Sequence, residues 1–234
     1  MGKLYSWLDE RAGLTQTLGP LLSRKIPKGV GWWYTFGSAP LFVFLLQAVT
    51  GILMALYYSP SPDHAYDSVS YINNQAAMGN FIRGLHHWGA SAMVVLVVLH
   101  MLRIIIMGAY KYPREVTWFV GVVLFVIVMA FGFTGYLLPW DEKAYWATTV
   151  GTNMAGTVPV IGGWILILLR GGTELGAVTL TRFYALHVLV LPMIALMFVA
   201  AHLYLVVRLG ISAPPEKIES RKQSVTPDDG RRAA

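Results

Sequence analysis

Four long apolar segments constrain the fold of this chain more than any other feature. They cover about residues 37–58, 80–107, 116–138 and 179–209, and each is near the roughly 20 residues that a helix needs to cross a bilayer. Only 13% of the 234 residues are charged and the mean hydropathy is +0.55, which excludes an ordinary soluble domain. The sequence therefore predicts an all-α integral membrane protein with four transmembrane helices.

The two ends of the chain differ from these spans. Residues 1–36 place leucines and Trp7 at helical spacing among basic residues, without the continuous apolar core and cleavage site of a secretory signal. We expect an interfacial helical segment lying on the membrane, with a partly ordered soluble tail as the alternative. The main domain then covers 37–210, and residues 211–234, rich in Pro, Ser and charge, form a polar tail.

The connections between the spans are of three kinds. Residues 59–79 form a loop that contains two prolines, and residues 111–114 form a short basic turn. Residues 139–178 contain two short helical stretches, around Asp141–Asn153 and Ile161–Arg170, which are too amphipathic and too interrupted by Gly and Pro for another span. We expect a helical hairpin at the membrane surface in this third loop.

Basic residues are distributed unevenly between the two sides of the membrane. The N-terminal segment, the 111–114 turn with Arg103, and the chain from Arg208 onward hold 14 of the 18 lysines and arginines. By the positive-inside rule both termini face the cytoplasm or its equivalent, so the second and fourth spans both run from outside to inside. The net charge of +6 reflects this bias, and we expect no nucleic-acid binding.

Two pairs of histidines lie within the second and fourth spans. His86 and His100 are fourteen residues apart, which places them roughly 40° apart around a helix and about 21 Å apart along it. His187 and His202 are fifteen apart, an offset of roughly 60° and about 22 Å, although Pro192 between them should kink the helix. Parallel spans place His86 with His187 at an outer level and His100 with His202 at an inner level.

Paired imidazoles at two depths favour haem over other cofactors. Imidazole is an axial ligand of haem iron, and a haem held by one histidine from each of two helices is six-coordinate, with no open position for substrate. Two such haems would carry electrons across the bilayer. A zinc or di-iron site would need clustered ligands with carboxylates, and none is evident within the spans. With no cysteine, thiolate-bound clusters and thioether-linked haem are excluded.

Four glycines and three arginines complete the candidate site. Gly37 and Gly51 in the first span, and Gly121 and Gly135 in the third, repeat the fourteen-residue interval and match the two histidine levels. Glycine lets a bulky group approach the backbone, although small-residue helix packing is the alternative. Haem propionates need cationic partners, and the candidates, which could instead be topology anchors, are Arg83, Arg103 and Arg114. His64 and His87 are interpreted as ordinary polar residues.

Four long motifs carry a resemblance to a known family. GxxHHWxASxMVxxxxLHxxR (Gly84–Arg103), PREVTWxxGVVL (Pro113–Leu124), FGFTGYLLPWDEKAYWA (Phe131–Ala147) and TLTRFYALHVLVLP (Thr179–Pro192) resemble the N-terminal, haem-binding part of cytochrome b. The similarity covers roughly residues 20–213, and the fifteen-residue interval from His187 to His202 is similar to the short split form, cytochrome b6, of Rieske/cytochrome b complexes.

The resemblance implies a function and a set of partners. It implies an outer haem b on His86 and His187, an inner haem b on His100 and His202, and quinol oxidation at the outer face near Tyr136. One electron would pass to a Rieske iron–sulfur protein and onward to a c-type cytochrome or plastocyanin-like acceptor, the other through the two haems, with proton translocation. The outer quinol site would be completed by a separate subunit carrying the C-terminal part of cytochrome b, in a homodimeric complex of a bacterial cytoplasmic or thylakoid-type membrane.

One residue departs from the cytochrome b6 pattern, and two other functions remain open. Cytochrome b6 attaches an additional c-type haem through a cysteine that follows a tyrosine, and here Tyr34 is followed by Thr35. We therefore expect no covalent haem at Thr35. The alternatives are a di-haem membrane anchor of a hydrogenase or formate dehydrogenase and, from a different class, a haem-free transporter that uses the histidines as relays.

Overall fold

The structure, a computed structural model, describes residues 2–13, 15–16 and 30–212, and every regular element within them is a helix. In chain order the elements are α1 (Lys3–Ala12), the 3₁₀ helix η1 (Trp32–Gly37), α3 (Ser38–Ala55), α4 (Ala65–Asn74), α5 (Gly79–Ile106), α6 (Glu115–Leu137), α7 (Glu142–Gly156), α8 (Gly162–Arg170), α9 (Ala177–Ala185), the π-helix η2 (Leu186–Val190) and α10 (Leu191–Leu209).

Four helical segments are long and apolar enough to cross a membrane: Trp32–Ala55, Gly79–Ile106, Glu115–Leu137 and Ala177–Leu209. The four predicted spans are thereby confirmed. The first begins at Trp32 rather than at residue 37, because η1 continues directly into α3. It also ends earlier, at Ala55, and Tyr57 and Tyr58 close it in a turn.

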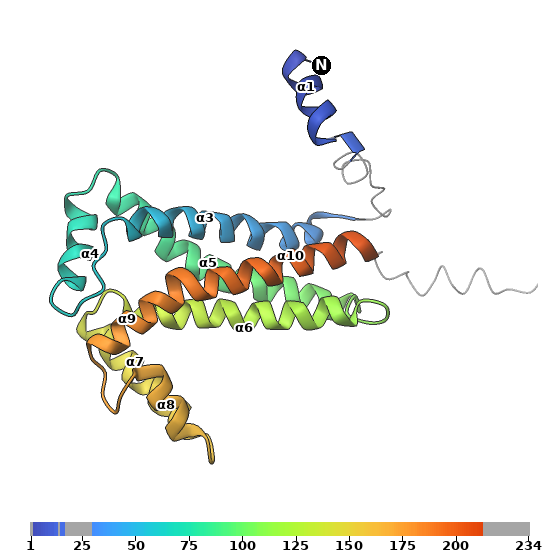
Figure 1. Cartoon of the computed structure of the whole chain (residues 1–234). Helices are drawn as coiled ribbons and strands as arrows, with labels where there is room; N and C mark the ends of the chain where they lie inside the picture. The colour runs from blue at the N-terminus through green and yellow to red at the C-terminus, as the bar shows by residue number, and fades with distance from the viewer. Residues whose placement is uncertain (1, 14, 17–29, 213–234) are drawn as a thin grey trace, which may run out of the picture.

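The four spanning helices α3, α5, α6 and α10 lie side by side as one bundle (Figure 1). At one end, here called the outer end, lie α4 and the α7–α9 region, and at the other, the inner end, lie η1 and the turn between α5 and α6. A cluster of buried apolar residues lies at the outer end and comprises Ala65, Leu137, Leu180 and Phe183. Along the spans most large apolar side chains are exposed, as expected of helices that face lipid.

The third loop contains the two predicted helices, α7 and α8, which lie against each other as a hairpin beside the outer end of the bundle (Figure 1). Asp141 caps α7, because its carboxylate accepts the backbone N–H of Ala144 at 2.7 Å. At the end of α8 Gly171 adopts a left-handed conformation (φ 80°), which lets the chain turn toward α9.

Residues 59–79 contain a helix, α4, that the sequence reading took for a loop. Pro60 and Pro62 indicated a turn, but the segment that follows them is amphipathic, with Ala65, Val69 and Ile72 at helical spacing. Ala65 and Ile72 are buried against the outer end of the bundle. The prediction of a loop was therefore wrong, because this short apolar stripe lies in a mostly polar segment next to two prolines.

Tyr58 links this connection to the start of the third loop. Its hydroxyl donates a hydrogen bond to the carbonyl of Leu138 at 2.7 Å, and its ring stacks on Tyr184. Burial raises the pKa of the Tyr58 phenol above its usual value, with the neighbouring Tyr184 adding to the effect. The phenol is therefore a neutral donor throughout the physiological pH range.

The N-terminal helix α1 is exposed along its length and ends at Gly13 in a left-handed conformation. The side chain and backbone of Thr15 donate hydrogen bonds that lower the pKa of Asp9. The leucines and basic residues expected on the same interfacial face between 17 and 29, and the tail beyond residue 212, lie outside the described residues.

Candidate functional site

The structure brings the four histidines together in two pairs. His86 on α5 faces His187 on η2, with ring centres 6.3 Å apart, and His100 on α5 faces His202 on α10, with ring centres 6.5 Å apart. Neither pair is stacked, since the rings cross at 68° and 78°. All four side chains are half-buried inside the bundle. The two pairs occupy the outer and inner levels expected from the parallel direction of the second and fourth spans.

A π-helical turn explains how unequal histidine intervals produce matched levels. In η2 the backbone N–H of Leu191 bonds the carbonyl of Leu186, five residues back, just before Pro192, whose missing N–H and ring disturb ordinary helical bonding. A π turn accommodates one extra residue. The fifteen-residue interval from His187 to His202 therefore spans nearly the same helix as the fourteen residues from His86 to His100.

Each histidine faces one of the four candidate glycines on a neighbouring helix. A methyl group at the glycine would come within 3.2 Å of Cε1 of His86, 2.6 Å of Cε1 of His187, 3.5 Å of Cε1 of His100 and 3.4 Å of Cε1 of His202. The glycines concerned are, in the same order, Gly51, Gly135, Gly37 and Gly121. At Gly135 and Gly51 a side chain would push the imidazole out of place. At Gly121 and Gly37 the added methyl group would only touch the ring, so the lack of a side chain matters most at the outer level.

The hydrogen-bond partners of the histidine Nδ1 atoms differ between the outer and the inner level. Nδ1 of His86 lies 2.9 Å from Oγ1 of Thr50, and Nδ1 of His187 lies 3.1 Å from Oγ1 of Thr134. At the inner level Nδ1 of His100 and of His202 is buried with no hydrogen-bond partner among the described residues. The sequence reading missed both threonines, although each directly precedes a candidate glycine.

The donor set and the spacing fit a haem at each level. A metal–imidazole bond of about 2 Å plus about 1.1 Å from nitrogen to ring centre, taken on both sides, gives ring centres about 6.2 Å apart. The observed 6.3 and 6.5 Å agree. Within the described chain no three His, Cys, Asp or Glu side chains gather to hold a metal ion by themselves. Two axial imidazoles suffice for an iron whose other four ligands come from a porphyrin.

Two of the candidate arginines lie at the inner end. Arg103, one turn beyond His100, is 9% exposed and lies 3.8 Å over the ring of Tyr34, and its Nε and Nη2 are buried without a hydrogen-bond partner among the described residues. Tyr34 in turn donates a hydrogen bond to the carbonyl of Ser212 at 3.0 Å. Arg114, at the start of α6, likewise has a buried Nε that finds no partner in the part of the chain that the structure describes. Buried guanidinium groups with free donors fit carboxylates such as haem propionates.

Other predicted residues are more exposed. Arg83, near the outer start of α5, donates to Oδ1 of Asn73 at 3.3 Å. Tyr136 is 41% exposed on the last turn of α6, next to the start of the third loop. His87 is exposed and packs edge-on against Trp88, and His64 is exposed at the start of α4. The hydroxyl of Thr35 is exposed and donates to the carbonyl of Trp32.

Arg170 is a further residue of the outer end that the sequence reading assigned only to topology. It is 6% exposed and donates four hydrogen bonds, to the hydroxyl of Thr152, the side chain of Asn153 and the carbonyls of Thr149 and Thr173, at 2.8–3.0 Å. Its own carbonyl accepts the hydroxyl of Thr179. The side chain of Arg170 therefore joins the end of α8 to α7 and to the loop that follows α8, and its main-chain carbonyl joins the start of α9.

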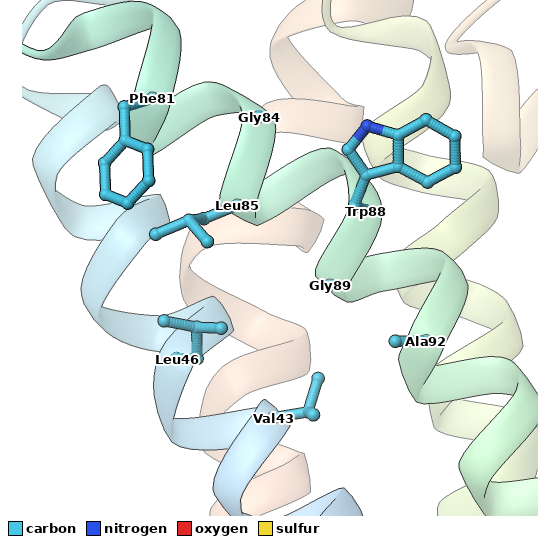
Figure 2. Close-up of a pocket in the computed structure, with 8 residues that line it drawn as sticks. All are labelled: Val43, Leu46, Phe81, Gly84, Leu85, Trp88, Gly89 and Ala92. Atoms are coloured by element: carbon cyan, nitrogen blue, oxygen red, sulfur yellow. The ribbon is translucent and has the colours of Figure 1, made fainter.

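An apolar groove lies between α3 and α5 (Figure 2). None of the four histidines lines it. Its sides are aliphatic and aromatic, and the largest ring in it, Trp88, is exposed. It is lined by Val43, Leu46, Phe81, Gly84, Leu85, Trp88, Gly89 and Ala92.

Comparison with known proteins agrees with this arrangement. The family model described as cytochrome b/b6/petB matches residues 21–210, close to the range over which the motifs resemble that family. The chain belongs to the cytochrome b family. Cytochromes b are integral membrane proteins that carry b-type haem, and the haem-free transporter alternative does not agree with this membership.

Relatives of the cytochrome b chain come from two kinds of complex. It is 45% identical to the menaquinol:cytochrome c reductase cytochrome b subunit of Geobacillus thermodenitrificans, over 92% of this chain and 99% of the relative. It is 42% identical to cytochrome b6 of Synechococcus sp. (strain JA-3-3Ab), over 92% of this chain and 100% of the relative. A structure titled hyperthermophilic respiratory Complex III superposes with a TM-score of 0.85 at 36% identity, over 92% of this chain and 57% of that chain.

Proposed function

We propose that this cytochrome b is the redox subunit of a quinol oxidoreductase that works with a Rieske protein. The observation that carries the proposal is the pair of imidazole pairs at two depths, with ring centres 6.3 and 6.5 Å apart and a glycine beside every ring. Relatives that the chain matches over nearly their whole length are named as cytochrome b subunits of menaquinol:cytochrome c reductase and as cytochrome b6.

Each histidine pair holds one haem b. His86 and His187 ligate the outer haem and His100 and His202 the inner one, each through Nε2. A haem held by two imidazoles would supply one-electron transfer without binding substrate. The glycines Gly37, Gly51, Gly121 and Gly135 keep the rings in place, Arg103 and Arg114 neutralise the inner propionates, and Arg83 serves the outer haem.

Quinol is oxidised at the outer end, close to Tyr136 and beneath the α7–α8 hairpin. One electron leaves through the Rieske protein toward a c-type cytochrome or similar acceptor, and the other crosses the bilayer between the two haem levels. Quinone is reduced at the inner end, and protons are released outside and taken up inside. The hydrogen bonds from the buried Arg170 side chain to α7, here called the Arg170 cage, hold the hairpin over the oxidation site.

A separate subunit that carries the C-terminal part of cytochrome b completes the outer quinol site, as the likeness to cytochrome b6, a relative matched over 100% of its length, implies. The assembled complex is a homodimer. Both termini lie on the cytoplasmic side of a bacterial cytoplasmic membrane, and the bias of basic residues supports this orientation. Thr35 cannot form a thioether, so no haem is attached covalently there.

Haem stoichiometry and turnover of the purified complex test the proposal. Pyridine haemochrome spectra should give two b haems per copy of this chain, none bound covalently to it, and the complex should reduce cytochrome c with quinol. One b haem per chain, or none that dithionite reduces, would contradict the ligand assignment. Two b haems without quinol:cytochrome c activity would instead favour a di-haem anchor of another enzyme.

A further inference from the structure

The residue before each of the four ring-facing glycines differs between the two levels. At the outer level it is threonine in both cases, and at the inner level it is apolar in both cases. The pairs are Thr50-Gly51 and Thr134-Gly135 at the outer level, and Phe36-Gly37 and Val120-Gly121 at the inner level. Thr50 and Thr134 are 3% and 6% exposed, so their hydroxyls have no access to bulk water.

Counting the hydrogens around Thr50 determines the direction of its bond to His86. The Thr50 hydroxyl donates to the carbonyl of Leu46 at 2.6 Å. A hydroxyl has one hydrogen and can accept through its lone pairs. The contact of 2.9 Å between Oγ1 of Thr50 and Nδ1 of His86 must therefore be an N–H of His86 donating to Thr50.

The same reasoning applies at the other outer histidine. Thr134 donates its hydroxyl hydrogen to the carbonyl of Ala130 at 2.7 Å, so Nδ1 of His187, 3.1 Å away, is the donor to Oγ1. Both outer imidazoles thus carry their proton on Nδ1. The lone pair of each is on Nε2, the nitrogen that a metal would take.

No equivalent hydroxyl serves the inner rings. Nδ1 of His100 and of His202 lacks a hydrogen-bond partner within the part of the chain that the structure describes. Main-chain carbonyls four residues before the glycine lie near three of the rings, that of Gln47 near His86, that of Phe131 near His187 and that of Thr117 near His202. Among the described residues a threonine hydroxyl contacts a ring nitrogen at the outer level only.

We propose that Thr50 and Thr134 are positioning residues that fix the tautomer and ring orientation of the outer haem ligands and lower the reduction potential of the outer haem alone. A hydrogen bond accepted from Nδ1–H makes an imidazole a stronger electron donor through Nε2, which favours ferric over ferrous iron. The proposal rests on the haem ligation proposed above.

The test uses Thr50→Val and Thr134→Val in the full complex, since valine keeps the shape of threonine without its hydroxyl. Redox titration of the two haem b absorbance bands should show a rise in the outer potential for each variant and a larger rise for the double variant, with the inner potential unchanged. The low-spin ferric signal of the outer haem in electron paramagnetic resonance should shift as well. An unmoved outer potential, or an equal shift of both haems, would overturn the proposal.

Serine variants separate the hydroxyl from simple loss of packing. Thr50→Ser and Thr134→Ser keep a donor and acceptor at the same place and should keep the outer potential near that of the unaltered complex. A shift as large as that of the valine variants would assign the effect to the lost methyl group and refute the role of the hydroxyl.

A reciprocal variant at the inner level keeps the proposal testable even where the outer variants fail to assemble. Val120→Thr introduces the Thr-Gly pair beside His202 and should lower the inner potential without moving the outer one. An inner potential that stays in place would refute the role of this position. Haem counts on the same samples separate failure of this proposal from failure of the proposed haem ligation. Two retained haems with unchanged potentials contradict only the role of the threonines. Missing haem in the unaltered complex contradicts the ligation itself.

Discussion

The outer and inner ends of the bundle satisfy their polar groups in different ways. At the outer end hydroxyls meet the histidines, Arg170 is enclosed by four acceptors, and the apolar core packs around Leu137 and Phe183. At the inner end lie seven of the ten buried side-chain polar atoms that have no partner among the described residues. They belong to His100, Arg103, Arg114, Thr117, His202 and Ser212.

This difference indicates which end depends on bound groups. A buried polar group left unpaired costs about 1–3 kcal/mol, and a charged one costs more. The outer end meets most of this requirement with its own side chains, although Oγ of Ser61 and Oγ1 of Thr148 are buried without a partner among the described residues. The inner end concentrates guanidinium donors around Arg103, and we expect it to gain most of its order from the carboxylates of its haem.

Removing one histidine of the inner pair should have the largest effect on haem content, because it should abolish the inner haem and leave the outer one. His100→Ala should eliminate the inner haem, halve the haem b content and stop electron flow across the bilayer, while the protein still inserts. Haemochrome spectra on the purified complex measure the loss. His87→Ala is the matched control, because His87 is exposed and only packs on Trp88, and it should retain both haems. Two haems in His100→Ala would contradict the pairing.

Alanine substitutions at the four glycines should reduce haem content to different degrees, more at the outer level than at the inner one. The approach of a new methyl group to the facing ring is 2.6 Å at Gly135, 3.2 Å at Gly51, 3.4 Å at Gly121 and 3.5 Å at Gly37. We expect haem loss to follow that order, with Gly135→Ala losing most of the outer haem and Gly37→Ala tolerated. Haem content per chain gives the ranking. Equal losses at Gly135 and Gly37 would show that ring clearance is not what the glycines provide.

Breaking the cage of Arg170 should destabilise the outer end by about 3 kcal/mol, because four hydrogen bonds are lost and buried acceptors are left unpaired. Arg170→Met should lower the temperature of thermal inactivation and raise the KM for quinol by loosening the hairpin. Arg182→Met removes an exposed arginine with a single bond to the carbonyl of Leu168 and should change little. Equal behaviour of the two variants would show that the cage does not hold the hairpin.

Arg103 offers the smallest and most specific perturbation, and it acts at the inner end. Arg103→Gln removes a buried cation near the inner haem. This loss should make reduction of the inner haem less favourable by roughly 1–2 kcal/mol, which lowers its potential, and should leave the outer potential unchanged. Redox titration detects the shift, and Arg103→Lys should recover part of it. An inner potential insensitive to Arg103 would argue that the guanidinium only packs against Tyr34.

Much of the architecture could be predicted because membrane helices are decided by local properties. Spans such as Glu115–Leu137 are visible as apolar runs, and the paired levels of the histidines follow from helical geometry and the bias of basic residues. The helix α4 was predicted as a loop, because Pro60 and Pro62 precede it and its apolar stripe, which buries Ala65 and Ile72, is only ten residues long. Arg170 was interpreted as a topology residue, since its acceptors are main-chain carbonyls and hydroxyls with no sequence signature.

The amino-acid sequence alone determined the number of spans and the residues at which metal ligation is possible, because bilayer thickness and helical rise leave few other solutions. The tertiary structure decided what surrounds each ring: the π turn before Pro192 that matches two unequal intervals, the clearance at each glycine, and the hydroxyl acceptors of Thr50 and Thr134 at one level only. These depend on atoms of different helices meeting within about 3 Å, which requires the helices to be packed.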